Sequence, residues 1–582
     1  MKMKKNKRMS PCQRNSILSK IFCVILLIFS VLSCNENEFL KEIPIDFYSP
    51  ENSFVTSGDF EAAIYSLHAS LRDQLWGQSS QSRFPRIGWY GTDLVESRYD
   101  TDGSHNYSVL WGPHGLTFDI WELSYRLIFD ANVILERSES NISKLTPEEK
   151  VYFQAEARFF RAYAYNILAN LYGGVPIVLE EIKSPRRDFV RASRQETYEQ
   201  CAKDLEFAVA NLNDIDKVDE SRINRLAASH VLSEVYISLG RWQDAINEAS
   251  KVINHPNTKL MTERFGISTE YLFNDPNFYE GDVYWDLFRQ GNQDRSAGNT
   301  ESIWVLQYKY NVVGGGDQNY ELERFVGPDL TKAHIFQSGG KTSPVLAKPN
   351  TYYNGRGQGF NKPSPYFLTT LWEKSGYDVD IRNSKGNIIR DVKVNNPGNE
   401  YDGKWVIADN LPLKISHNDD TTRHFYPIIG KVITPGKHPG PYWDPDQTIP
   451  GSLLGSAQHT WRKHYMIRLA ETYLLRAEAY LGNNDLENAA KDINIVRNRS
   501  NAPSITPDEV NIDYILDERL RELYFETLRI ITLARLNKVV DRAQKLNPIV
   551  GSTIQPHQNL WAIPFSEINK NVESVLEQNP GY

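Results

Sequence analysis

The sequence TPEEKVYFQAEARFFRAYAYNILANLYGGVP, residues 146–176, gives the clearest indication of the architecture. Thr146 is a typical N-cap residue, and Pro147 suits the first position of a helix. Gly173 and Pro176 mark the end of the helical pattern. The stretch therefore predicts a long amphipathic helix over residues 148–172. Its apolar residues recur at the spacing of one helix face: Phe153, Ala157, Phe160, Ala164, Ile167, Leu168 and Leu171.

The same periodicity recurs on both sides of this helix. It predicts one helix pair around Gly240, at 225–239 and 242–253, and another around Gly482, at 467–481 and 486–499. Both turns resemble those of tetratricopeptide helix pairs, in which small residues let two helices approach closely. The two turns are 242 residues apart, so the sequence holds no uninterrupted tandem array. Further helices are expected at 59–73, 117–138, 195–212 and 512–537, which makes the fold all-α or mainly helical.

Glycine and proline separate the helical flanks from a loop-rich centre. Residues 291–460 hold 20 of the 35 Gly and 13 of the 29 Pro, with one good strand pattern at 302–310. Loops this long are usually functional or disordered, and the many aromatic residues here favour an ordered, functional region. We therefore expect helical parts at 34–290 and 461–582 of one scaffold. Residues 291–460 are expected to form a loop-rich, minor-β insertion that binds ligand and caps the scaffold.

The N-terminus is typical of a processed leader. Residues 1–33 carry seven Lys or Arg and no acidic residue, and the apolar run at 21–32 is shorter than the roughly 20 residues that span a bilayer. Val31-Leu32-Ser33-Cys34 is similar to a bacterial lipobox, whose cysteine thiol accepts a lipid. We expect a signal peptide over 1–33 and a lipid anchor on Cys34. The alternative is an ordinary signal peptide followed by an incidental cysteine.

Composition excludes several classes of protein. The chain is 40% hydrophobic and 24% charged, which argues against a polytopic membrane protein and a disordered chain. Without residues 1–33 it has 58 basic and 73 acidic residues, a net charge of -15, so no nucleic-acid partner is expected. Of its four cysteines, Cys12 and Cys23 would leave with the leader and Cys34 would carry lipid. Cys201 would then remain alone, which rules out an internal disulfide.

No motif of a catalytic, cofactor or metal site is complete. The Gly-rich stretches lack the Gly-Lys-Ser/Thr of a phosphate loop, and no His-Glu-x-x-His is present. Residues 100–103 begin like a calcium loop, but the twelfth position is Trp111 instead of Glu. The 73 acidic residues neither exclude nor identify the carboxylate pair of a glycosidase. The motif search therefore identifies no cofactor site, no metal site and no catalytic residue, and it leaves a carboxylate pair open.

A set of motifs covers nearly the whole chain after Cys34: Phe39-Leu40, Pro44-Ile45-Asp46, residues 155–163 and 171–176, residues 470–480 and 493–499, Glu518 to Leu523 with Phe525-Glu526, Ile563-Pro564, and the ending Gln578-Asn579-Pro580-Gly581-Tyr582. Together these motifs resemble those of the SusD/RagB-type surface lipoproteins of Bacteroidota. Most charged residues of these motifs are expected to form buried ion pairs within the helices. This set comprises Arg158, Arg161, Arg476, Glu478, Glu518 and Glu522.

The resemblance implies both a fold and a role. The fold would be a helical scaffold with tetratricopeptide-like pairs and an irregular region that caps one side. The protein would be held by its lipid on the cell surface, at the outer membrane. There it would act without catalysis as a lid and capture module over a SusC-like TonB-dependent β-barrel transporter. Most members of the family bind oligosaccharides or polysaccharide, and a few bind peptides.

An oligosaccharide site needs aromatic rings for the C–H faces of the sugars and fixed polar groups for their hydroxyls. Two regions of the sequence supply both. The candidates are Arg83, Trp89, Arg98, Tyr99, Asp102, Asn106 and Tyr107 in the first region, and Tyr308, Tyr310, Tyr320 and Trp372 in the second. Each ring has packing in the core as its alternative role, and Trp121 and Phe129 are expected in the core. Peptide capture by the same scaffold is the second hypothesis, and a surface glycoside hydrolase is the third.

Overall fold

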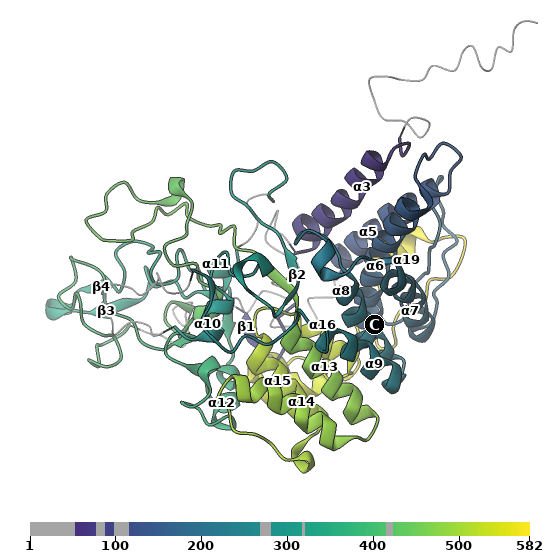
Figure 1. The fold of residues 1–582 in the computed structure, drawn as a ribbon. Coiled ribbons are helices and arrows are strands. Elements are labelled where there is room, and N and C mark those ends of the chain that lie inside the picture. The colour runs from purple at the N-terminus through teal and green to yellow at the C-terminus, as the bar shows by residue number, and fades with distance from the viewer. Residues whose placement is uncertain (1–52, 77–87, 98–115, 268–280, 317–320, 415–422) are drawn as a thin grey trace, which may run out of the picture.

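The computed structural model describes residues 53–76, 88–97, 116–267, 281–316, 321–414 and 423–582. The expected leader at 1–33 and the expected lipid site at Cys34 lie outside these residues. The fold is mainly α-helical, as predicted, with a helical body and a loop-rich body side by side (Figure 1). Within the described residues, no helix combines the length and the apolar character needed to cross a bilayer.

A series of antiparallel helices forms the helical body. In chain order these are α5 (Leu116–Ser138), α6 (Pro147–Tyr172), α7 (Arg194–Asn211), α8 (Arg225–Ser238), α9 (Trp242–Ile253), α13 (Leu469–Gly482) and α14 (Leu486–Arg499). Each helix packs against the next one in this series, including α9 against α13. The two tetratricopeptide-like pairs, far apart in the sequence, are therefore neighbours in one continuous stack. The loop-rich centre is inserted between α9 and α13.

The helix predicted from residues 146–176 is confirmed at both ends. The Thr146 side chain accepts a hydrogen bond from the Glu149 backbone N–H, and the Glu149 carboxylate accepts one from the Thr146 N–H. At the other end Gly173 has a φ of 78°, which ends the helix because other residues rarely adopt it. This capping box and glycine stop fix α6, the helix against which α5 and α7 pack.

The helix expected over residues 512–537 is divided in two. α15 (Ile512–Leu523) ends before Phe525, whose φ is 55°, and α16 (Arg529–Arg535) begins six residues after α15 ends. Other helices are α3 (Ser57–Ala69), which continues as the π-helical η1 (Ser70–Trp76), and α10 (Val283–Leu287), α11 (Leu322–Val326), α12 (Leu371–Glu373), α16 (Arg529–Arg535), α17 (Val539–Leu546), α18 (Pro548–Gly551) and α19 (Phe565–Lys570).

Short antiparallel strand pairs organise the loop-rich body. They are β1 (Val95–Ser97) with β5 (Asn361–Pro363), β2 (Ser302–Leu306) with β8 (His464–Arg468), β3 (His334–Phe336) with β4 (Thr342–Pro344), and β6 (Ile388–Ile389) with β7 (Ile428–Ile429). The predicted strand at 302–310 is β2, which is shorter than expected. Because β2 pairs with β8, the strand near the start of the insertion meets the strand near its end, directly before α13.

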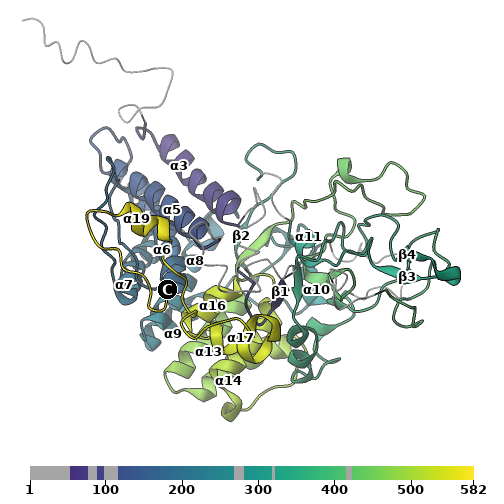
Figure 2. The same ribbon diagram turned by 180° about the vertical axis from the view of Figure 1, so that it is seen from behind.

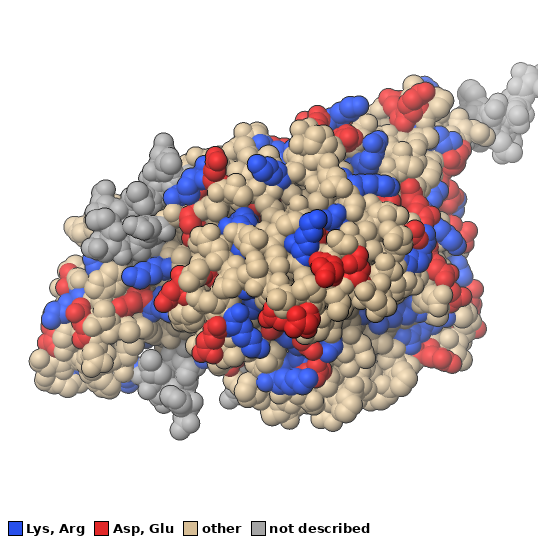
Figure 3. Space-filling view, turned by 60° about the horizontal axis from the view of Figure 1, so that its bottom comes forward, with Lys and Arg blue, Asp and Glu red and all other residues tan. Residues whose placement is uncertain are grey.

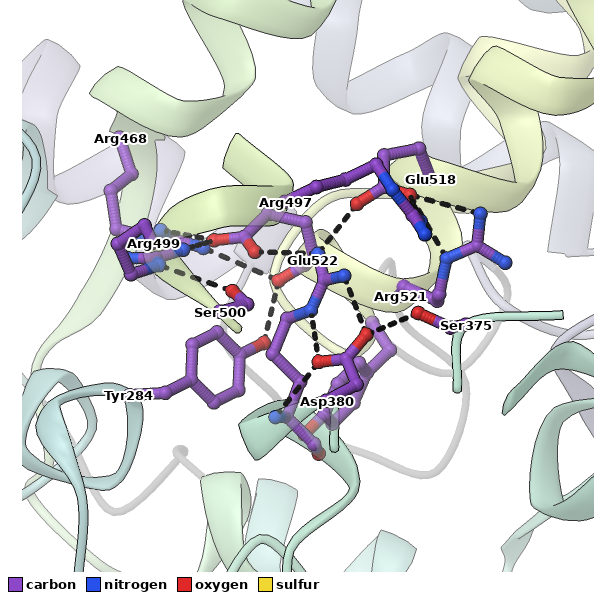
Figure 4. Close-up of polar contacts among 12 residues, drawn as sticks. Tyr284, Ser375, Asp380, Arg468, Arg497, Arg499, Ser500, Glu518, Arg521 and Glu522 are labelled. Atoms are coloured by element: carbon purple, nitrogen blue, oxygen red, sulfur yellow. Dashed lines mark hydrogen bonds and ion pairs between the residues drawn. The ribbon is translucent and has the colours of Figure 1, made fainter. Parts of the chain in front are cut away.

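A buried ion-pair network holds the insertion to the C-terminal helices (Figure 4). Arg382, in the insertion, is fully buried and binds Asp380 as well as Glu518 and Glu522 of α15. Glu522 also binds Arg468 at the end of β8 and Arg499 of α14. Charged side chains of both signs are interspersed over the surface in Figure 3, whereas here they are sequestered in pairs.

Candidate functional site

A cleft of about 900 Å³ opens where α3 meets the insertion. One wall is a face of α3 and η1, with Tyr65, His68 and Arg72. The opposite wall is the loop that follows β2, residues 307–316, which we call the β2 loop. Between the walls lie Val305 and Leu306 of β2. Polar residues from other segments also line the cleft: Asp219, Glu220, Ser221, Ser296 and Lys463. The cleft therefore combines ring surfaces with charged and neutral hydrogen-bonding groups.

Arg72 joins the two walls. Its Nε and Nη2 donate to both carboxylate oxygens of Asp73 at 2.7 Å. Its Nη1 donates to the backbone oxygens of Gly314 at 2.9 Å and Gln307 at 3.3 Å. The guanidinium carbon also lies 5.8 Å from the centre of the Tyr308 ring. A planar group with several donors can make these contacts together, so Arg72 fixes the width of the cleft.

Glycine is required in the β2 loop for steric reasons. Gly316 has a φ of 85°, and a Cβ there would lie 2.9 Å from the Tyr308 ring. The Lys309 N–H donates to the Gly315 oxygen at 2.7 Å, which closes the loop on itself. The loop thereby packs against Tyr308 and leaves Val313 fully exposed at its tip.

His68 gives the cleft a neutral polar group. Burial lowers the pKa of His68 to about 3, and the charges of Arg222 and Arg72 act in the same direction. Its imidazole is therefore uncharged at neutral pH. The His68 Nε2 is buried and has no hydrogen-bond partner among the described residues.

An aromatic cluster lies on the β2 loop beside the cleft. The Tyr310 ring centre is 4.7 Å from that of Trp461, and Tyr442 stacks on Trp461 at 6.3 Å. The Trp461 indole N–H donates to the Gly316 oxygen at 3.4 Å, which ties the cluster to the loop that forms the cleft wall. Tyr310 is 42% exposed, so its ring is available for stacking.

The structure separates the sequence-predicted ligand residues into three groups. Tyr308 lines the cleft but is only 3% exposed, and Tyr310 lies beside the cleft. Trp89 and Trp372 are fully buried and present no ring surface to a ligand. The Trp89 indole donates to the Thr527 oxygen at 2.7 Å, and Trp372 packs on Phe367. Arg83, Arg98, Tyr99, Asp102, Asn106, Tyr107 and Tyr320 lie outside the described residues.

The sequence interpretation missed the α3 wall. Tyr65, His68 and Arg72 recur at a spacing of three and four residues, which places them on one helix face. That spacing is visible in the sequence, but polar faces of helices are common. Only the position of the β2 loop shows that this one lines a cleft.

Two clusters of side chains resemble functional sites in their residue types, one a catalytic triad and the other a metal site. Thr351 Oγ1 lies 2.8 Å from His438 Nδ1, and His438 Nε2 lies 2.9 Å from Glu323. All three residues are buried, and Thr351 Oγ1 also accepts from the Gly436 N–H, so the chain ties together its own loops here. Asp214, Asp216 and His255 also converge. There the carboxylates already bind His255, Asn257 and Arg295, so protein partners occupy them.

Comparisons with known proteins agree along most of the chain. A model of the SusD family matches residues 454–582, and one described as "Starch-binding associating with outer membrane" matches residues 50–237. "SusD-like protein P25" of Formosa agariphila is 25% identical, over 95% of this chain and 97% of that protein. A "SusD-like protein" of Bacteroides ovatus is 23% identical, over 87% of this chain and 80% of that protein.

Solved structures share the fold. A "Laminarin binding SusD-like protein" has a TM-score of 0.64 at 21% identity, covering 90% of this chain and 99% of that one. "Surface glycan-binding protein A" of Bacteroides thetaiotaomicron, solved in complex with laminarihexaose, has a TM-score of 0.63 at 18% identity, with coverage of 90% and 99%.

Proposed function

This chain belongs to the SusD family, and we propose that it captures oligosaccharides or polysaccharide at the cell surface without catalysis. It would deliver them to a SusC-like TonB-dependent transporter in the outer membrane. Its anchor would be a lipid on Cys34, exposed after removal of residues 1–33. The observation that carries the proposal is the cleft between α3 and the β2 loop, with the aromatic cluster beside it.

The lining of the cleft matches the chemistry of a sugar chain. Tyr65 is 42% exposed on one side and Tyr310 is 42% exposed beside the other, so each offers a ring face to sugar C–H groups. Between them, Asp219 and Lys309 can hydrogen-bond to hydroxyls. The volume of about 900 Å³ suits several sugar rings. Two similar solved structures, a laminarin-binding SusD-like protein and a complex with laminarihexaose, support a glucan as the first candidate ligand.

The test is calorimetric titration of the chain from Asn35 onward with laminarihexaose, a panel of other oligosaccharides, and peptides. We expect saturable binding of at least one glycan. Tyr65→Ala and Tyr310→Ala should each weaken it about 5- to 30-fold, because a stacked ring contributes about 1–2 kcal/mol. Phe336→Ala is the matched control, since Phe336 is an exposed ring on β3, and it should leave the affinity unchanged.

Each other outcome points to a different function. Binding of peptides without glycans would support the peptide-capturing alternative. New reducing ends in the titrated sample, abolished by one Asp or Glu substitution, would show a hydrolase. Glycan binding that survives both tyrosine substitutions would place the site elsewhere on the molecule.

A further inference from the structure

A second cavity lies on the helical body and is formed by helices and segments other than those that form the cleft. It has a volume of about 300 Å³ and is formed by α5, the segment 176–189 and the C-terminal segment around α19. Figure 2 shows α19 against α5 on this side of the molecule. Its walls are largely aromatic and aliphatic, with Phe118, Trp121, Tyr125, Phe129, Phe189 and Leu576. We call this cavity the α5 pocket.

The uncharged polar groups of the α5 pocket already have protein partners. The Tyr125 hydroxyl donates to the Pro176 oxygen at 2.7 Å. Asn132 donates to the Val178 oxygen at 3.0 Å and accepts from Arg161 at 2.8 Å. Asn571 accepts from the Phe189 N–H and donates to the Phe189 oxygen, both at 2.8 Å. A sugar would find few hydrogen-bond partners there, so the walls favour an apolar group.

An apolar ring on the wall of the pocket is exposed. Trp121 is buried, as the sequence predicts, but the prediction that Phe129 lies in the core is wrong, because 40% of Phe129 is exposed. Phe129 is one of the lining residues of the α5 pocket. An exposed aromatic ring on the wall of an apolar pocket is typical of a protein-binding surface.

Charge indicates which partner this surface fits. Glu122, Glu180 and Glu567 line the pocket against one lysine, Lys570. Lys570 is paired with Glu567 at 2.8 Å, and Arg186, which lies 5.0 Å from the centre of the Phe189 ring, is 3.8 Å from Glu180. Among the described residues this leaves Glu122 as the lining carboxylate without a cationic partner. Anionic lipid would be repelled by this rim. The chain's own segment 35–52 would be repelled too, because its acidic residues outnumber its one basic residue, Lys41. The acidic residues are Glu36, Glu38, Glu42, Asp46 and Glu51.

We propose that the α5 pocket is a docking site for a segment of a partner protein. That segment carries a tryptophan or similarly large apolar side chain, which fills the pocket, flanked by lysine or arginine, which faces Glu122. Large aromatic anchors in desolvated pockets supply most of the affinity at such interfaces. The flanking charges select the partner and increase its association rate.

The test uses two short probes, Ac-Lys-Trp-Lys-NH2 and Ac-Glu-Trp-Glu-NH2, titrated by NMR into the chain from Asn35 onward. The lysine peptide should bind with a Kd of about 0.1–1 mM, as expected for a small ligand with one anchor. The glutamate peptide should bind at least about fivefold more weakly, and salt at about 0.5 M should reduce this difference. Phe129→Ser should weaken binding of the lysine peptide about fivefold or more. Glu122→Lys should reduce the preference for the lysine peptide over the glutamate peptide.

Controls separate this site from the cleft. Tyr65→Ser removes an exposed ring of the cleft and should leave peptide binding unchanged, while Phe129→Ser should leave glycan binding unchanged. Phe129 is exposed, so its loss should not unfold the chain, which circular dichroism verifies.

Four results would overturn the proposal. They are no binding of either peptide, equal binding of both, binding that is insensitive to Phe129→Ser, and evidence of another occupant. Peptide binding that emerges only in a Leu40→Asp, Phe47→Asp variant would show that the chain's own N-terminal segment fills the pocket. Dimerisation that Phe129→Ser abolishes would show a second copy there.

Discussion

At the residue scale, the defining feature of the structure is a set of buried ion pairs, most of which join two different helices or strands. Arg161 binds Asp204 of α7, Glu478 binds Arg535 of α16, and Glu518 binds three arginines. The sequence correctly indicated that such motif residues would be paired. Pairing within each helix was the wrong part of that prediction, because most partners come from other elements. The periodicity of a helix shows on which face of that helix a residue lies. It does not show which other helix or strand packs against that face.

The first prediction concerns Glu522. Burial alone would raise the pKa of Glu522, but Arg499, Arg468 and Arg382 hold it at about 2. Glu522→Gln should therefore destabilise the protein by about 3–5 kcal/mol, because it leaves buried guanidinium groups uncompensated. Denaturant unfolding at neutral pH measures this change. Glu573→Gln, at an exposed position, should change stability by less than about 0.5 kcal/mol.

The acid range provides an independent check on Glu522. A carboxyl with a lowered folded pKa contributes stability above its unfolded pKa, and this contribution is lost as the pH falls through the folded value. The wild type should therefore lose stability between about pH 4.5 and 2, and Glu522→Gln should lose less over that range. Parallel acid profiles would show that Glu522 does not contribute in this way.

The second prediction concerns Lys431, a buried lysine that binds Glu526 and donates to the Tyr284 hydroxyl at 3.1 Å. Burial lowers the pKa of Lys431 to about 7, despite the opposing effect of Glu526. The number of charges around Lys431 also favours a neutral amine. Five arginines there meet five carboxylates, so the positive and negative charges are equal in number without Lys431. The arginines are Arg382, Arg468, Arg497, Arg499 and Arg521, and the carboxylates are Glu301, Asp380, Glu518, Glu522 and Glu526.

Between about pH 7 and 10 the unfolded chain binds a proton on Lys431 that the folded chain lacks, so stability should rise with pH. Lys431→Met should remove a rise on the order of 1–3 kcal/mol, measured by urea unfolding at intervals over that range. Lys217→Met, at an exposed lysine, should retain the wild-type profile. If the Lys431→Met variant has the same pH profile as the wild type, Lys431 stays charged in the fold.

At the element scale, the helix pairs could be predicted from the sequence, whereas the short strands and the two walls of the cleft could not. Capping signals and the 3.6-residue period located α6, α8, α9, α13 and α14. The strands of the insertion have two to five residues, too few for an alternating pattern to stand out. Loop aromatics such as Trp89 and Trp372 gave no signal that separates a core ring from a ligand contact. The cleft needs α3 and the β2 loop together, which are far apart in the sequence.

The third prediction tests the contact that joins the two helix pairs. A Cβ at Gly482 would lie 2.5 Å from the Trp242 ring, so the turn after α13 sits directly on the start of α9. Gly482→Ala should cost about 1–3 kcal/mol, because the ring has to move within a packed interface. Gly455→Ala is the control, since a Cβ there meets nothing within 4 Å and the residue has no positive φ. Thermal unfolding of both variants measures the difference, and equal midpoints would argue against the contact.

At the scale of the whole molecule, the insertion and the helical body share one hydrophobic core. The buried cluster runs without interruption from Phe60 of α3 through Trp304 and Ile428 to Ile563 near the C-terminus. Asp93, just before β1, binds both Arg529 of α16 and Arg542 of α17. The region that carries the cleft is therefore held by contacts on several sides. Such support gives a binding site the rigid frame that its loops lack on their own.

This shared core leads to the last prediction, that the described body unfolds as one cooperative unit despite its length. If the insertion unfolded alone, Glu518 and Glu522 would lose Arg382 inside a body that is still folded. Unpairing buried charges costs several kcal/mol each, so partly unfolded states should be sparsely populated. Far-ultraviolet circular dichroism follows the helices, and tryptophan fluorescence also follows rings of the insertion such as Trp372 and Trp443. We expect both signals to change at the same urea concentration. Loss of fluorescence at lower urea, with helical signal retained, would show that the insertion is an independent folding unit and that the network does not couple the two.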